Sequence, residues 1–352
     1  MKFSRENHLG NNEIATSDHR RDYFDQLPDP LLHLIFNKIL DAKTLVRCLP
    51  VSKRFNSLIS QTDAVFLPLP PQKNKPAKLV RSFFRFLHKI VSKKPRNAHR
   101  NVFYHSPCEV LKGFNELKSL HLELPRCKGE MGFAGKDSLL KWKAEFGSNL
   151  RNCVILGANS LKKEKIAKND NLAKENDNQN ALSDDELKLR IVWMISCLIA
   201  ASARHYLLKR VVSDFPTLTN VVVSDGDRRG KVLIGGEELA ELRSESVSGD
   251  SSDVALESSL ERSLIPDLGM KMWYVPRMVL PTCGWVLEGA TLVVIKPLDR
   301  GVIGKGSDGC DCDLLVGGGG LDGDEEEREI LDEAVRQMVK MKKTYVMEMT
   351  SF

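Results

Sequence analysis

The residue patterns that would signal catalysis are incomplete in this sequence of 352 residues. The segment Gly304–Ser307 reads GKGS, but a phosphate-binding GxxxxGK[ST] loop would need glycine where Asp299 stands and serine or threonine where Gly306 stands. A GxSxG nucleophile elbow, an HExxH helix and a cysteine–histidine signature are all absent from the sequence. We therefore expect no catalytic residues.

Potential metal ligands are also poorly arranged. Cys310 and Cys312 form a CxC pair with no second cysteine or histidine pair nearby, which argues against a zinc site. The aspartates between Asp311 and Asp324 do not meet the twelve-residue calcium-loop pattern. His121 lies on a predicted strand, where we expect a packed or surface side chain. No metal or other cofactor is expected.

Composition and length describe an ordinary soluble protein of two or three domains. Hydrophobic residues make up 42% and charged residues 28% of the chain. The net charge of +5 is mild, but it is unevenly distributed, with ten Lys/Arg and no Asp/Glu from Gln72 to Arg100 and an acidic run from Asp322 to Glu329. A general affinity for polyanions does not follow.

The cysteines and the apolar runs of the chain indicate its cellular compartment. The eight cysteines are scattered and the N-terminus has no apolar core typical of a secretory signal, so we expect reduced thiols in the nucleus, the cytoplasm or both. The apolar run Ile191–Ala203 spans 13 residues, short of the ~20 needed to cross a bilayer. We interpret it as a core helix and expect no membrane partner.

After a polar arm at residues 1–22, which we expect to be disordered, three short helices are predicted. Pro28 and Pro30 suit the first turn of a helix and Asp29 favours its positive end. Thr44 is the expected N-cap of a second helix that stops near Pro50. A third begins near Ser52, with Lys53 and Arg54 facing water. So small a bundle cannot bury all its apolar residues, and we expect some of them to face a partner.

The segment 23–60 resembles an F-box. The resemblance rests on Leu27-Pro28, Leu31-Leu32, Ile35-Phe36, Leu45, Val51-Ser52, the basic pair, Phe55 and Leu58. It implies three helices that dock onto a Skp-type adaptor, which bridges to a cullin scaffold. The adaptor-binding residues that it implies are Leu27, Pro28, Leu31, Leu32, Ile35, Phe36, Ile39, Leu45, Cys48, Val51, Ser52, Phe55 and Leu58.

Three positions depart from the usual F-box pattern. Thr44 stands where many F-boxes have aspartate and Phe55 where many have tryptophan. We expect both to keep the physical role of the family residue, as cap and aromatic anchor. Pro50 shortens the second helix and is expected to weaken adaptor affinity.

Further segments resemble the auxin-up-regulated F-box proteins of plants. They are HSPCEVLKGFNELKSLHLELP, LKWKAEFGSNLRNCVILGANS, LKLRIVWMISCLIAASARHYLLK and the C-terminal KKTYVMEMTSF. The resemblance implies a receptor subunit of an SCF-type ubiquitin ligase, linked to plant hormone response.

Residues 61–103 read as a Pro-rich and basic linker with an amphipathic helix. Its apolar stripe consists of Leu79, Val80, Phe83, Phe84, Phe86, Leu87, Ile90 and Val91. The stripe fits docking on the chain itself, nuclear import near 93–96, a membrane-surface helix or a calmodulin-type target. A nuclear nucleic-acid-binding or adaptor protein acting through 72–100 is the main alternative function.

From residue 104 to 352 we predict a substrate-recognition α/β domain, α+β when the F-box is included. Expected strands are Leu117–Leu124, Leu150–Leu156, Leu218–Val223, Met270–Tyr274, Ala290–Ile295 and Thr344–Met349. Expected helices are 106–113, Asp137–Phe146, one from the Ser183 capping box to about Val212, and Glu325–Lys342. LxxLxLxL at Leu117–Leu124 favours a degenerate leucine-rich-repeat-like array with a mostly parallel sheet.

Polar segments near 159–182, 243–263 and 301–327 are expected to be disordered loops. Trp273, Tyr274 and Trp285 are candidates for recognition of an unknown protein substrate, with a place in the core as the alternative. Taken together, the sequence predicts a non-enzymatic F-box receptor that presents proteins for ubiquitination and proteasomal degradation, with nucleic acid an unexpected partner.

Overall fold

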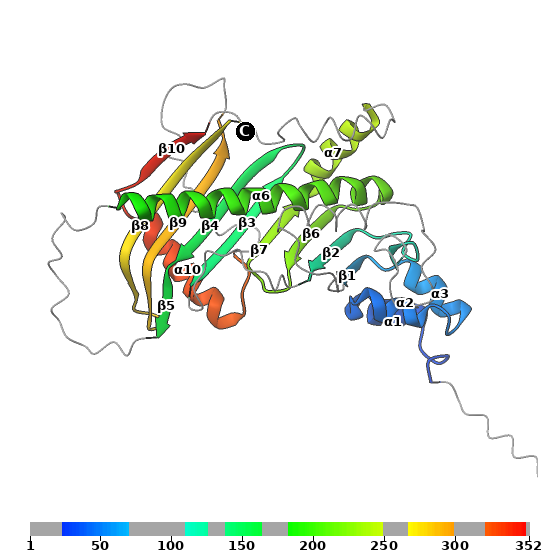
Figure 1. The fold of residues 1–352 in the computed structure, drawn as a ribbon. Helices are drawn as coiled ribbons and strands as arrows, with labels where there is room; N and C mark the ends of the chain where they lie inside the picture. Colours follow the sequence, from blue (N-terminus) through cyan, green and yellow to red (C-terminus); the bar gives the residue numbers. More distant parts are fainter. Residues whose placement is uncertain are drawn as a thin grey trace, which may run out of the picture.

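The computed structural model describes residues 23–69, 110–125, 138–163, 182–248, 267–298 and 321–349, apart from the side chains of 207, 209, 210 and 245–248. The basic amphipathic stripe, the GKGS segment and the CxC pair lie outside these residues. Figure 1 shows three helices at one end of a wide sheet, with a long helix across one face.

The elements follow in a fixed chain order. Helices α1 (Asp29–Ile39), α2 (Ala42–Cys48) and α3 (Lys53–Ser60) precede strand β1 (Ala64–Pro68). The remaining strands are β2 (Ser119–Leu124), β3 (Leu139–Phe146), β4 (Leu150–Ala158), β5 (Ser160–Lys163), β6 (Asn220–Asp225), β7 (Gly230–Ile234), β8 (Leu268–Leu280), β9 (Trp285–Pro297) and β10 (Tyr345–Met349). The remaining helices are α6 (Asp184–Asp214), α7 (Gly236–Ser248) and α10 (Glu325–Val339).

The strands form one sheet in the order β1-β2-β6-β7-β3-β4-β9-β8-β10, with β5 also paired to β9. Among the described strands only β1–β2, β2–β6 and β3–β7 pair in parallel; the other pairs are antiparallel. The prediction of a mostly parallel, leucine-rich-repeat-like sheet was therefore wrong. Antiparallel hairpins need only short turns, and such turns join β3 to β4, β6 to β7 and β8 to β9.

Strand β3 corrects a second prediction, the helix at Asp137–Phe146. Trp142 and Ala144 point to the α6 face, and Lys141 and Lys143, which are also buried, point to the opposite face. This alternation has the period of a strand. Gly230 on β7 leaves room for the Trp142 ring, since a Cβ there would lie 1.9 Å from Trp142 Cε2.

Helix α6 begins with the predicted capping box of Ser183 and Glu186 and crosses one face of the sheet (Figure 1). It is long and apolar enough to span a membrane by length and composition, yet 53% of its most apolar window is buried inside the fold. Its inner face packs Trp193, Cys197 and Ala201 into the core that β3 and β4 share, as expected of a core helix. Helix α10 covers the other face over β8 and β9.

Segments predicted as loops or linker carry some regular structure. Strand β5 lies inside 159–182, α7 extends to Ser248, α10 begins at Glu325, and β1 lies inside 61–103. Most of the remaining residues of those segments, and most of the predicted helix at 106–113, fall outside the described residues.

Candidate functional site: the exposed face of the N-terminal helices

Helix α1 has two apolar faces. Pro28 is its N-cap and Pro30 lies in the first turn, as predicted. Leu32 and Phe36, one turn apart, are buried in the main core. Leu31, Leu34 and Ile35 lie on the other side and are 47%, 54% and 42% exposed. One apolar face of α1 is thus buried in the core of the chain, and the second is exposed to water and available to a partner.

The caps of α2 and α3 fix the chain between these faces. Asp41, not Thr44, is the N-cap of α2: its carboxylate accepts hydrogen bonds from Thr44 N at 2.9 Å and Thr44 Oγ1 at 2.5 Å. Thr44 therefore supports the cap from the third helical position. Ser52 caps α3 as predicted, accepting from Phe55 N at 3.0 Å. Helix α2 ends at Cys48, two residues before Pro50.

Phe55 anchors the bundle from within. Its ring meets Phe36 at 5.1 Å and Phe24 at 5.7 Å between centroids, both edge to face. The phenylalanine that replaces the usual tryptophan thus joins α3 to α1 and to the chain that enters α1.

Arg54 does not simply face water, which corrects the sequence interpretation. Its Nε donates to Asp29 Oδ1 at 2.7 Å, and its other nitrogens donate to the carbonyl oxygens of Phe24 and Leu27. The guanidinium thus holds the segment that carries Leu27 and Pro28 against α3. Sequence inspection missed this role, although the basic pair after Ser52 was visible.

The residues predicted to bind the adaptor divide by exposure. Four of them are buried in the chain's own core, namely Leu32, Phe36, Leu45 and Leu58. The partly buried ones are Leu27, Ile39, Cys48 and Phe55, and the exposed ones are Pro28, Leu31, Ile35, Val51 and Ser52. The exposed group is free to make direct contact, whereas the buried group shapes the surface from below.

Further exposed apolar residues were missed. Leu34 follows Leu31 by three positions, the spacing that places both on one helix face, so the sequence carried the signal. Leu40, 43% exposed, ends α1 with a φ of 57°. Tyr23 and Phe24, before α1, are 77% and 52% exposed. The apolar surface is wider than the family pattern implied.

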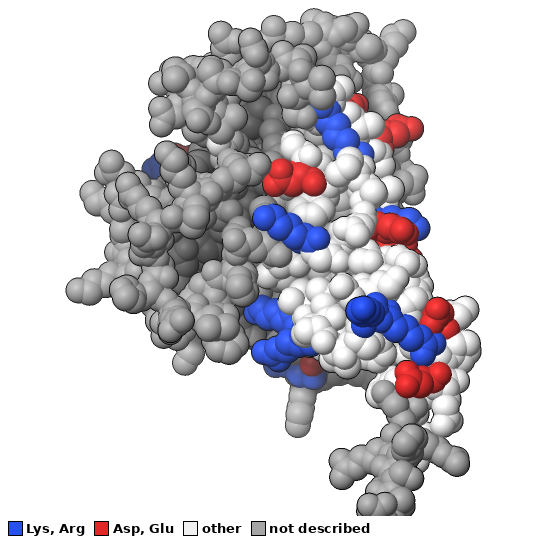
Figure 2. Space-filling model, turned by 90° about the vertical axis from the view of Figure 1, so that its right-hand side faces the viewer, with Lys and Arg blue, Asp and Glu red and all other residues white. Residues whose placement is uncertain are grey.

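Charge does not single out this end of the molecule. Figure 2 looks onto the side that carries the three helices and β1, and its described surface is mostly uncharged, with acidic and basic side chains interspersed. An apolar interface, rather than one dominated by a charged patch, fits this surface.

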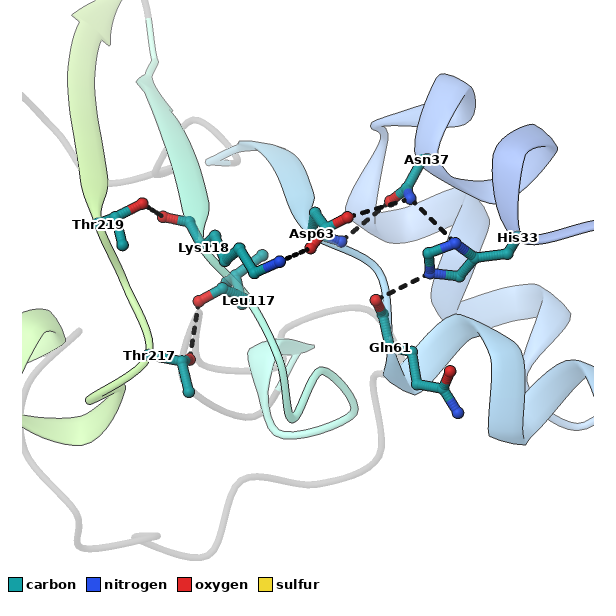
Figure 3. A network of polar contacts seen from close by, with 8 residues as sticks. All are labelled: His33, Asn37, Gln61, Asp63, Leu117, Lys118, Thr217 and Thr219. Atoms are coloured by element: carbon teal, nitrogen blue, oxygen red, sulfur yellow. Dashed lines mark hydrogen bonds and ion pairs between the residues drawn. The ribbon is translucent and has the colours of Figure 1, made fainter. Parts of the chain in front are cut away.

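A polar network joins the helices to the sheet (Figure 3). Asn37 on α1 accepts from Asp63 N at 2.9 Å and donates to Asp63 Oδ2 at 3.4 Å. His33 Nε2 lies 3.0 Å from the carbonyl oxygen of Gln61. Lys118 Nζ lies 2.7 Å from Asp63 Oδ1, and this ion pair lowers the pKa of Asp63. Residues from α1, the start of β1 and the start of β2 therefore meet at Asp63.

Backbone contacts tighten the same junction. The Asp63 carbonyl accepts from the N–H groups of Lys118 and Ser119, and Phe66 N donates to the Leu40 carbonyl at 2.7 Å. Leu45 and Ile59 belong to the same core cluster as Val65, Leu120 and the inner face of α6. The three helices and the sheet thus share one core.

Other candidates for chemistry are packed residues. Trp273 is buried, Tyr274 donates to Glu186 at 2.8 Å, and Trp285 is partly buried beneath Lys163, so none offers a wholly free aromatic surface. His121 packs against the Phe66 ring and lies 2.7 Å from Ser224 Oγ, and burial lowers its pKa. Within the described ranges, no group of three or more potential metal ligands comes together.

Comparison with known proteins identifies relatives among the F-box proteins of plants. Residues 24–65 match the family model described as F-box-like. The chain is 36% identical to F-box protein At4g18380 of Arabidopsis thaliana over 94% of both chains. It is 34% identical to F-box protein AUF1 of the same plant, over 94% of this chain and 100% of that one. It is also 35% identical to F-box protein AUF2 over 78% and 86% of the two chains.

No solved structure matches the chain. The F-box-like match spans the three helices and ends at residue 65, inside β1. Together with relatives that cover nearly the whole chain, these features show that the chain belongs to the plant F-box proteins of the auxin-up-regulated subfamily.

Proposed function

We propose that this protein is the substrate-recognition subunit of an SCF-type cullin–RING ubiquitin ligase. In this proposal α1–α3 bind a Skp-type adaptor and through it a cullin scaffold. The sheet region holds a protein that is then ubiquitinated and degraded by the proteasome. The chain itself contributes no catalytic group, because its task is to raise the concentration of acceptor lysines near the transfer centre.

One observation carries the proposal: α1 exposes Leu31, Leu34 and Ile35 while its opposite face is already buried. Covering three such side chains contributes about 25 cal/mol for each Å² removed from water. Folding of the chain alone does not bury this apolar surface. Binding of an adaptor with a matching apolar surface would bury it and so stabilise the complex.

The junction at Asp63 supports a receptor role in a second way. Asp63 contacts α1 through Asn37 and β2 through Lys118, and β1 is hydrogen-bonded to Leu40. These contacts hold the adaptor-binding helices in a set orientation to the sheet. A bound substrate would then present the same lysines to the transfer centre in every complex.

The proposal is tested by co-purification of the full chain with a Skp-type adaptor. We expect wild type to capture the adaptor and the double variant L31D/I35D to lose capture, because both carboxylates would be buried in the interface. The variant I199D serves as the matched control, since Ile199 on α6 is 43% exposed and Ile35 is 42% exposed.

Circular dichroism separates loss of binding from loss of fold. Normal capture by a folded L31D/I35D would contradict the proposal. Salt-sensitive binding of RNA or DNA by a chain that captures no adaptor would support action through residues 72–100 instead.

We also propose that the protein works in the nucleus, the cytoplasm or both, within plant hormone response. The relationship to AUF1 and AUF2 supports the link to hormone response. The scattered cysteines support the location. A tagged full chain imaged in plant cells, with its abundance followed after auxin treatment, tests it. Secretion of the protein would contradict the location, and an abundance unchanged by auxin would contradict the link to hormone response.

A further inference from the structure

The two edges of the sheet differ sharply. At β1 the outer edge is occupied, because Phe66 N donates to the Leu40 carbonyl at 2.7 Å and Asp41 forms a bridge to Phe66. The strand also ends in Pro68, which cannot donate to another strand. The helices thus close this edge.

At the opposite edge, no described element pairs with the outer side of β10. Figure 1 shows no described helix or strand beyond it. Within the described part of the chain, the strand Tyr345–Met349 pairs with β8 alone. Its sequence, YVMEM, contains no proline or lysine, and Glu348 is its one charged residue. Natural sheets usually protect a free edge with proline or charged residues, because exposed backbone N–H and C=O groups recruit another strand.

Val346 lies at the middle of this edge and is 71% exposed, more than any other large apolar side chain that the structure describes except Tyr23. Tyr345, Met347 and Met349 point to the other face, where they pack partly against the main core. A second strand beside β10 would cover Val346 on one face and extend the apolar row on the other.

We propose that β10 pairs with β10 of a second copy of this chain, antiparallel across a two-fold axis at Val346. Such a contact is self-complementary, as a two-fold interface must be. Val346 then lies opposite Val346 of the other copy, and Tyr345 lies opposite Met347. The exposed Glu348 of each copy comes beside the residues preceding the other strand, where Lys342 supplies the opposite charge.

Pairing through β10 does not require adaptor binding. The β10 edge is at the far end of the sheet from α1–α3 (Figure 1), so pairing would leave both groups of helices uncovered. A dimer would carry two adaptor-binding surfaces, one at each outer end.

Sedimentation velocity of the full chain across a concentration series tests the proposal. We expect wild type to move from 39.5 kDa towards twice that mass. The variants V346E and V346K should each raise the dissociation constant by about tenfold or more, because like charges face each other across the axis. Mixing V346E with V346K should restore association as a heterodimer.

The pair I199E and I199K serves as control, since Ile199 is an exposed apolar residue of α6 that lies away from β10. Neither change should alter the dissociation constant. A wild-type monomer at every concentration, or V346E and V346K proteins that dimerise as wild type does, would overturn the proposal and leave the edge to an extended segment of another protein. Adaptor capture by the same variants stays a separate measurement.

Discussion

Lys118 Nζ lies 2.7 Å from Asp63 Oδ1 and thereby ties the first residue after α3 and its turn to the start of β2. The two residues are 55 positions apart (118 − 63), and much of the intervening chain lies outside the described residues. Asp63 also binds Asn37 of α1. One acidic side chain thus links the F-box helices to the sheet, beside the backbone hydrogen bonds and the core that they share.

The ion pair predicts a pH dependence of stability. The hydrogen bond from Lys118 is the largest cause of the lowered pKa of Asp63, whose ordinary value is 3.8. A lowered folded-state pKa gives stability that is fully present above the ordinary value and is lost as the pH falls through the folded-state pKa. Urea unfolding at pH 6 and pH 3 should therefore show a smaller loss for D63N than for wild type. Equal losses in the two proteins would contradict this role.

The two faces of α1 predict opposite consequences of truncation. Phe36 is 4% exposed and packs against Phe55, so F36A should lower the free energy of unfolding by about 3–5 kcal/mol. Leu34 is 54% exposed, so L34A should change it by less than about 0.5 kcal/mol. Urea denaturation measures both. A large loss in L34A would mean that this face is structural.

The Arg204–Asp225 pair beneath α6 predicts a strong effect that depends on pH. Their side chains are 9% and 13% exposed, and burial raises the pKa of Asp225 despite the neighbouring guanidinium. R204M should cost about 3–5 kcal/mol, because it leaves a buried carboxylate without its cation. Arg204 lowers the pKa of Asp225, so its removal should raise that pKa further. Protonation of Asp225 then relieves more of the cost in R204M than in wild type as the pH falls, and the deficit should be smaller at pH 5 than at pH 8.

The exposed pair of Lys188 and Asp185, with side chains 73% and 94% exposed, provides the control. K188M should change stability by less than about 0.5 kcal/mol at either pH. A similar loss in R204M and K188M would refute the structural role of the buried pair.

Two glycines offer a matched test of packing. G230A should destabilise the fold by about 2 kcal/mol or more, because its Cβ would lie 1.9 Å from the buried Trp142 ring. At Gly236, the first residue of α7, a Cβ would meet nothing within 4 Å. G236A should therefore be neutral or stabilising by up to about 1 kcal/mol. Thermal unfolding measures the stability of both variants. Equal stabilities would show that close packing against Trp142 does not contribute to the stability of the fold.

Local signals predicted the starts of three helices. Pro28, Ser52 and the Ser183–Glu186 capping box mark three helix starts where the structure has them. Each of these capping signals involves only residues that are close in the sequence, so it can be recognised without knowledge of the fold. The Thr44 cap was wrong by three positions, because the preceding Asp41 is an equally good cap and is the one the fold uses.

Long-range pairing was predicted poorly. The alternation of Leu140, Trp142 and Ala144 with lysines was present in the sequence but was interpreted as a helix. The parallel array was inferred from leucine spacing, which does not state which strand lies beside which. The burial of Leu45 between α2 and the sheet could not be predicted from the sequence. It depends on the packing of the F-box helices against the β1 edge, which is a contact between distant parts of the chain.

Adaptor binding by the exposed face of α1 is tested by titration calorimetry of the full chain with a Skp-type adaptor. L34D should raise the dissociation constant at least about 100-fold, since a carboxylate buried without a partner costs several kcal/mol. I199D should leave the constant within about twofold of wild type. Equal affinities for wild type and a folded L34D would show that the exposed face of α1 is not the adaptor-binding surface.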